Sequence, residues 1–108
     1  MVMAHKYGVR LSHTPDICPL SNKASREFAK KGLGKMQELT QKHKVKVESL
    51  YHFDPEHLVI GVFEAENIES LRDLLMEMGL MHWNDLKINP VTPAETIMKT
   101  IDSMPTLF

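Results

Sequence analysis

Residues 45–64 read VKVESLYHF-DPE-HLVIGVFE, and this stretch decides the fold. Val45 to Phe53 and His57 to Glu64 are rich in the β-branched and aromatic residues that favour strands. Asp54-Pro55-Glu56 lies between them and indicates a turn, because proline fixes its own φ and lacks an amide donor. The stretch therefore predicts a β-hairpin.

The segments that precede this hairpin predict a strand and a helix. Lys6 to His13 alternates apolar and polar residues with a period of two, which is typical of a strand. Ser21 or Asn22 can cap a helix that follows a proline-containing loop. Gly32 and Gly34 weaken that helix by roughly 1 kcal/mol each relative to alanine. We therefore expect a break or a close backbone approach there.

The segments that follow the hairpin predict a second helix, a fourth strand and a short final helix. Asn67 precedes an apolar repeat at helical spacing, and Gly79 supplies a left-handed stop. Asp85 to Val91 is expected to be a strand, and Pro90 favours a position at the sheet edge. Thr92-Pro93-Ala94-Glu95 has the pattern of a capping box that opens a C-terminal helix.

The order of these elements predicts an α+β fold in a single domain, residues 1–108. The first six elements match the ferredoxin-like βαββαβ pattern. That fold has a four-stranded antiparallel sheet in the order 4-1-3-2, with both long helices on one face. The other face has no cover from within the chain, so we expect two such sheets to pack together in a homodimer or a higher oligomer.

Composition and charge narrow the classes of partner. Thirteen basic and 14 acidic side chains leave a net charge of −1, which gives no broad footprint for nucleic acid or an anionic membrane. No apolar run approaches the roughly 20 residues of a membrane helix, and no signal peptide or nucleotide-cofactor motif is evident. The single cysteine cannot form an internal disulfide. We therefore expect a cytoplasmic protein.

Four of the six histidines fall where the predicted topology brings distant segments together. The ends of the first two strands and the start of the third share one rim of the sheet, and the second helix returns the chain to that rim. His13, His52, His57 and His82 lie at these places. Because imidazole ligates transition metals, the cluster indicates a candidate metal site.

The hairpin suggests a specific pair within that cluster. A four-residue connection would place His52 across from His57, with β-carbons about 4.5–5.5 Å apart. We expect this face to be the open one, where a partner subunit would dock, and the opposite face to lie against the helices. The pair's face would also carry Glu48, Leu50, Val59 and Phe63. The opposite face would carry Val45, Val47, Tyr51, Leu58, Ile60 and Val62.

The leading hypothesis is a site with three imidazole ligands, namely His13, His52 and His57, with His82 as a further candidate. It would hold a divalent transition metal, with zinc, iron and copper not distinguished. Asp54 and Glu56 could orient the imidazoles, although turn residues need no such role. The alternative is a set of ordinary rim histidines, since the chain has no metal motif of fixed spacing.

Cys18 supports a separate hypothesis. Cys18-Pro19-Leu20-Ser21 precedes the first helix, and it resembles the Cys-Pro-x-Ser motif of monothiol glutaredoxins. A helix start lowers a thiol's pKa, which would suit thiol redox chemistry. The chain departs from that family, because a glutaredoxin places a helix between the second strand and the next hairpin, and here the hairpin follows directly. Cys18 could instead be a packed side chain, or a fourth ligand beside His13.

Trp83 is the only tryptophan and lies at the same rim. It could form the wall of a ligand pocket, or it could be hydrophobic packing with its indole N–H satisfied.

The element order resembles that of the dimeric α/β-barrel group of ferredoxin-like proteins, and within it small uncharacterised bacterial and archaeal proteins. The local stretches that carry the resemblance are His13-Thr14-Pro15-x-x-Cys18-Pro19-x-Ser21-Asn22 and Trp83-Asn84-Asp85. The resemblance implies a face-to-face dimer with a pocket, but the group's activities are too varied to fix a function. Three hypotheses remain open: a homo-oligomeric metal-binding protein, as an oxidoreductase or not an enzyme; a ligand-binding or assembly module; and a thiol redox protein.

Overall fold

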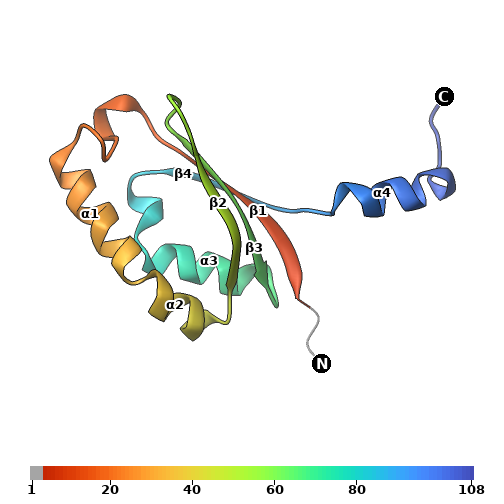
Figure 1. Cartoon of the computed structure of the whole chain (residues 1–108), viewed down its shortest axis with the longest axis horizontal. Coiled ribbons are helices and arrows are strands. Elements are labelled where there is room, and N and C mark those ends of the chain that lie inside the picture. The colour runs from red at the N-terminus through yellow and green to blue at the C-terminus, as the bar shows by residue number, and fades with distance from the viewer. Residues whose placement is uncertain (1–3) are drawn as a thin grey trace.

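The computed structural model describes residues 4–108 and contains a four-stranded antiparallel sheet (Figure 1). The order β2-β3-β1-β4 confirms the predicted ferredoxin-like arrangement, with β4 at an edge. The strands are β1 (His5–Ser12), β2 (Lys46–Phe53), β3 (Leu58–Ala65) and β4 (Asp85–Pro90).

Three α-helices cover one face of this sheet, and a fourth lies on the other side (Figure 1). The covering helices are α1 (Lys23–Gly34), α2 (Met36–His43) and α3 (Ile68–Glu77). The fourth helix is α4 (Ala94–Thr100). Single 3₁₀ turns are η1 (Pro15–Ile17), η2 (Leu80–His82) and η3 (Ile101–Ser103).

The predicted caps of two helices are confirmed. The side chain of Asn22 accepts a hydrogen bond from the Ser25 amide at 3.0 Å, and that of Asn67 accepts one from the Ser70 amide at 2.8 Å. Each bond satisfies one of the amides that a helix start leaves without a partner. The capping box expected before α4 does not form, because Pro93 is the capping residue and makes no side-chain bond.

The expected break in the first helix lies at Lys35, which separates α1 from α2. Gly32 is buried just before this break, and a β-carbon there would collide with the carbonyl oxygen of Met78. Gly79 follows with φ of 75°, the left-handed conformation predicted for the helix stop. The close approach fixes the end of α1 against the end of α3.

The hydrophobic core lies between the sheet and α3. Leu71, Leu74 and Leu75 of α3 are at most 1% exposed, and they belong to one cluster with Val9 and Phe63 of the two central strands. The core thus identifies the side of the sheet that faces the helices, and the hairpin residues can be assigned to one side or the other.

The predicted pairing and orientation of the hairpin are wrong. His52 pairs with Val59 rather than with His57, and both Val59 and Phe63 pack on the helix side. A bulge between Val47 and Ser49 shifts the alternation along β2, because an extra residue in one strand changes which side chains share a face. His52 therefore lies on the helix side of the sheet. By alternation, the open face carries Tyr51, Ile60 and Val62.

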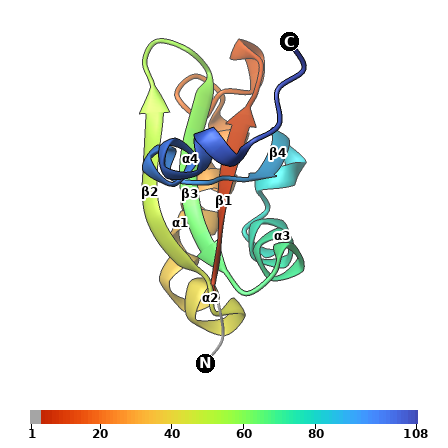
Figure 2. The same ribbon diagram turned by 90° about the vertical axis from the view of Figure 1, so that its right-hand side faces the viewer.

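Residues 91–108 form an arm on the open side of the sheet. Figure 1 shows α4 leaving the sheet without lying against it, and Figure 2 shows it crossing in front of the strands. Every residue from 89 to 108 is exposed.

Within residues 4–108, no helix has both the length and the apolar character needed to span a membrane.

Candidate metal centre

The strand register brings three distant segments to one end of the sheet. Ser12 is paired with Leu58 on one side and with Asp85 on the other. The residues that follow β1 and precede β3 and β4 therefore meet. The amide of His13 donates a hydrogen bond to the carbonyl oxygen of His57 at 3.2 Å, which ties two of these segments together.

The imidazole of His13 is held in one orientation by Asn84. The distance from His13 Nδ1 to Asn84 Oδ1 is 3.0 Å, and Asn84 Nδ2 donates to the Leu80 carbonyl at 3.1 Å. The second bond directs the amide oxygen, rather than the amide nitrogen, toward His13. Because of these two hydrogen bonds, we assign the proton of the His13 imidazole to Nδ1 and the lone pair to Nε2.

That Nε2 atom is buried and has no hydrogen-bond partner among the described residues. A buried polar atom without a partner costs about 1–3 kcal/mol, so this arrangement calls for an explanation. Nε2 is also the atom through which a neutral imidazole with a bound Nδ1–H would ligate a metal.

Cys18 is fixed in the loop between β1 and α1, directly after η1. Its side chain is 2% exposed, and its carbonyl oxygen accepts hydrogen bonds from the amides of Ser21 and Asn22 at 2.9 and 2.7 Å. In the same loop, a hydrogen bond from the Thr14 side chain, with help from backbone amides, lowers the pKa of the exposed Asp16 carboxyl. These backbone hydrogen bonds position the thiol within the loop.

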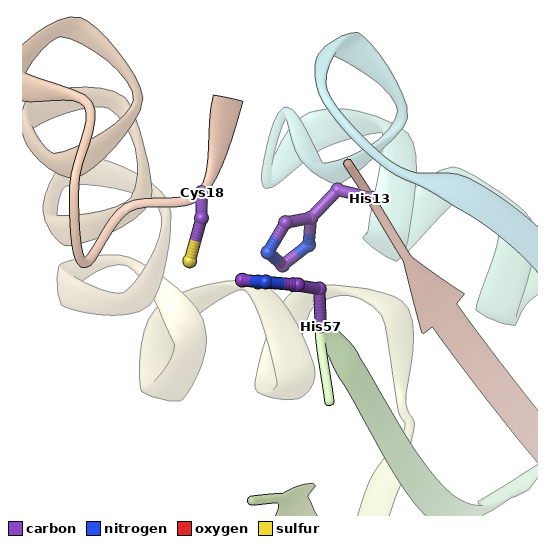
Figure 3. Close-up of side chains that lie close together, drawn as sticks. All are labelled: His13, Cys18 and His57. Carbon is purple, nitrogen blue, oxygen red and sulfur yellow. The ribbon is translucent and has the colours of Figure 1, made fainter. Parts of the chain in front are cut away.

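His13, Cys18 and His57 converge on one point (Figure 3). One ligand atom from each lies within 4.8 Å of the others, and the two imidazole centroids are 5.3 Å apart with an interplanar angle of 61°. A tetrahedral zinc ion would hold two imidazole nitrogens and a thiolate sulfur about 3.3–3.6 Å apart. The three atoms could reach that spacing by a contraction of roughly 1 Å.

Two of the predicted ligands lie outside this group. His52 Nδ1 is 2.7 Å from Asp54 Oδ1, so the carboxylate orients that imidazole as expected. His82 packs its ring against Phe28, with centroids 5.3 Å apart. Glu56 is exposed in the turn. The structure therefore brings together His13 and His57 from the predicted set, and it adds Cys18, which the sequence suggested as a possible fourth ligand beside His13.

Asn84 is the functional residue that sequence reasoning missed. It lies in the stretch Trp83-Asn84-Asp85, but no spacing rule connects it with His13, which is 71 residues away. Trp83 also contacts this imidazole, with ring centroids 5.2 Å apart. Its indole nitrogen is buried without a partner among residues 4–108, so the predicted satisfied N–H is not observed.

Trp83 and Asn84 also line a cavity of about 350 Å³ between α1 and the sheet. Its walls are largely apolar and include Leu33, Leu50 and Met78. His52 lines it as well. The cavity therefore adjoins the residues that hold His13.

No known protein family and no curated protein matches the chain. Among solved structures, the chain is similar to a de novo designed protein, Foldit4, with 11% sequence identity over 83% of this chain and 96% of that chain. The TM-score is 0.40.

Proposed function

We propose that this chain is a metal-binding protein that holds a divalent transition metal through His13 Nε2, Cys18 Sγ and an imidazole nitrogen of His57. The observation that carries the proposal is the buried Nε2 of His13, which lacks a partner among the described residues. His13 also lies in one group with Cys18 and His57, whose ligand atoms are within 4.8 Å of one another. A metal ion would satisfy this lone pair.

The donor set favours zinc. Two imidazoles and a thiolate suit zinc or copper, whereas magnesium and calcium prefer oxygen ligands. Three protein ligands would leave a fourth tetrahedral position for water or a substrate, as in catalytic zinc sites. Copper would instead suit electron transfer, so the identity of the metal decides between hydrolytic and redox chemistry. The burial of Cys18 supports a ligand role over a redox nucleophile, because reactive thiols are usually partly exposed.

Metal binding is tested on protein purified without a histidine tag. We expect one bound ion per chain by elemental analysis after equilibration with Zn²⁺. Cobalt substitution should give the thiolate-to-metal absorption band that reports Cys18. The variants Cys18→Ser, His13→Ala and His57→Ala should each lower affinity by more than about 100-fold, the upper end of the loss expected for an orienting residue alone.

The matched controls are His52→Ala and His82→Ala, which remove rim histidines outside the group. Both should bind Zn²⁺ like the parent chain. A chain that binds no stoichiometric Zn²⁺ would contradict the proposal. An equal loss in His52→Ala and His57→Ala would contradict this ligand set and favour the set of three imidazoles predicted from the sequence.

A second candidate function, binding of a small apolar molecule, is supported by the cavity under α1. Its volume lies at the lower end of the range for ligand sites, and its apolar lining matches theirs. Because Trp83 is the only tryptophan and lines the cavity, its fluorescence reports occupancy directly. With metal removed by a chelator, 1-octanol should change the emission of the parent chain. Ala29→Phe, which fills the cavity, should abolish the response, and the exposed Ala24→Phe on the same helix should not. An unchanged response in Ala29→Phe would exclude this site.

A further inference from the structure

The arm formed by residues 91–108 is amphipathic. Ile97, Ile101 and Met104 follow one another at spacings of four and three residues, which places them on one side of a helical segment. Met98 lies beside them. All four residues are between 39% and 65% exposed, so none is buried against the described part of the chain.

The helix in this arm is too short to be stable by itself. α4 has seven residues, and isolated helices below about 12–15 residues are marginal in water. It also lacks a side-chain cap at its start, which removes the usual local stabilisation. In proteins such a helix is stabilised by packing its apolar side, and α4 lies away from the sheet of its own chain (Figure 1).

The connection to β4 directs the arm away from its own sheet. The amide of Val91 donates to the carbonyl of Lys6 at 3.1 Å, which fixes the point of departure. Pro90 and Pro93 on either side restrict the backbone there. The radius of gyration is 16.3 Å, compared with about 13 Å for a compact chain of this length. The extended shape is consistent with an arm that reaches beyond its own domain.

The open face of the sheet offers a surface of matching character. Tyr51 and Phe53 on the edge strand β2 are 69% and 46% exposed, and Ile60 and Val62 lie beside them on β3. A sheet face with exposed aromatic and β-branched side chains is a candidate interface. The chain thus carries an apolar arm and an apolar patch on β2 and β3, on the same side of the sheet (Figures 1 and 2).

We infer that two copies of this chain exchange arms, so that Ile97, Met98 and Ile101 of each copy pack on the open sheet face of the other, near Tyr51. A second copy is the occupant because the two apolar surfaces belong to one chain and a two-fold axis would satisfy both at once. The inference is independent of the metal site, which lies on the helix side of the sheet.

The first test is the oligomeric state of the whole chain by sedimentation velocity over a range of concentrations. The parent chain should be a dimer. Met98→Glu on the arm and Tyr51→Glu on the face should each weaken the dimer at least tenfold, because each introduces a charge into an apolar contact. Met76→Glu is the matched control, since Met76 is 52% exposed on α3 at the other side of the sheet. That variant should remain a dimer.

The second test distinguishes exchanged arms from other dimers. A mixture of Met98→Glu and Tyr51→Glu retains one intact arm and one intact face in each heterodimer. The mixture should therefore form heterodimers more tightly than either variant forms homodimers. Circular dichroism of both variants checks that they fold, and Phe53→Glu replaces Tyr51→Glu if that variant does not. A monomeric parent chain, a Met98→Glu variant that dimerises normally, or a mixture with no complementation would each overturn the inference.

Discussion

Replacing Asn84 with leucine tests the most specific element of the proposed metal centre. Leucine has a similar shape but no acceptor, so His13 Nδ1 would lose the partner that now lies 3.0 Å away. The imidazole could then rotate or adopt the other tautomer, and Nε2 would no longer be fixed toward Cys18 and His57. The three proposed ligand residues are themselves unchanged in this variant.

The expected loss follows from the role of a group that orients a metal ligand. Removing such a partner typically lowers metal affinity about 10–100-fold, which corresponds to roughly 1.4–2.8 kcal/mol. Asn84→Asp keeps an acceptor oxygen toward Nδ1 and should recover most of the affinity. Asn89→Ala changes an exposed asparagine on β4, the strand that Asn84 precedes, and serves as the matched control.

The assay is a Co²⁺ titration in competition with a chelator, with the thiolate absorption band as the signal. Thermal unfolding of the metal-free variants measures any general loss of stability separately. Co²⁺ binding by Asn84→Leu as tight as that by Asn89→Ala would refute an orienting role for Asn84. An affinity loss in Asn84→Asp equal to that in Asn84→Leu would also refute it, because the acceptor oxygen would then be irrelevant.

Two further predictions concern stability. Gly32→Ala should destabilise the fold by about 1–3 kcal/mol in denaturant unfolding, because the added β-carbon would collide with the Met78 carbonyl. Gly34→Ala should be neutral or stabilising by up to about 1 kcal/mol, because no neighbouring atom lies within 4 Å of the β-carbon that it would add. Equal effects of the two substitutions would contradict the close approach at Gly32. The hydrogen bond from Lys42 holds the pKa of Glu77 below its usual range, so Glu77 stabilises the fold above its unfolded pKa and this contribution disappears as pH falls through the folded pKa. Glu77→Gln should therefore lower the unfolding midpoint at neutral pH but not at strongly acid pH, and a difference that persists in acid would show another cause.

The fold was predictable because its signals are local. Asn22 and Asn67 cap helices as single residues, and the alternation from Lys6 to Ser12 needs no distant partner to be recognised. The element order then restricts the topology. For the same reason the rim could be predicted, since strand direction alone places His13 and His57 at one end of the sheet.

Which side of the hairpin packs against the helices could not be predicted in the same way. Both sides of the hairpin carry apolar residues, so counting them does not separate Val59 and Phe63 of the core from Ile60 and Val62 of the open face. The bulge after Val47 has no marker such as glycine in its own strand, and it changes the alternation of every later residue of β2.

The ligand set and the cavity depend on details beyond the topology. Cys18 joins His13 because η1 folds the intervening loop back, and loop paths are not determined by the period of apolar residues. Asn84 becomes an orienting group only through its bond to the Leu80 carbonyl. The cavity exists because α1 stands apart from the sheet, a matter of packing that a pattern of helical spacing does not record.

The three donor residues lie in separate segments, and this has a consequence for folding. An ion shared by residues 13, 18 and 57 would act as a cross-link that joins the loop before α1 to the turn between β2 and β3. Such an ion binds the folded chain in preference to the unfolded one, so a free concentration 100 times the Kd would stabilise the fold by about 2.7 kcal/mol. The melting temperature of the chain would then respond to the supply of metal, and α1 would be the helix most affected, because its first turn directly follows the cross-linked loop.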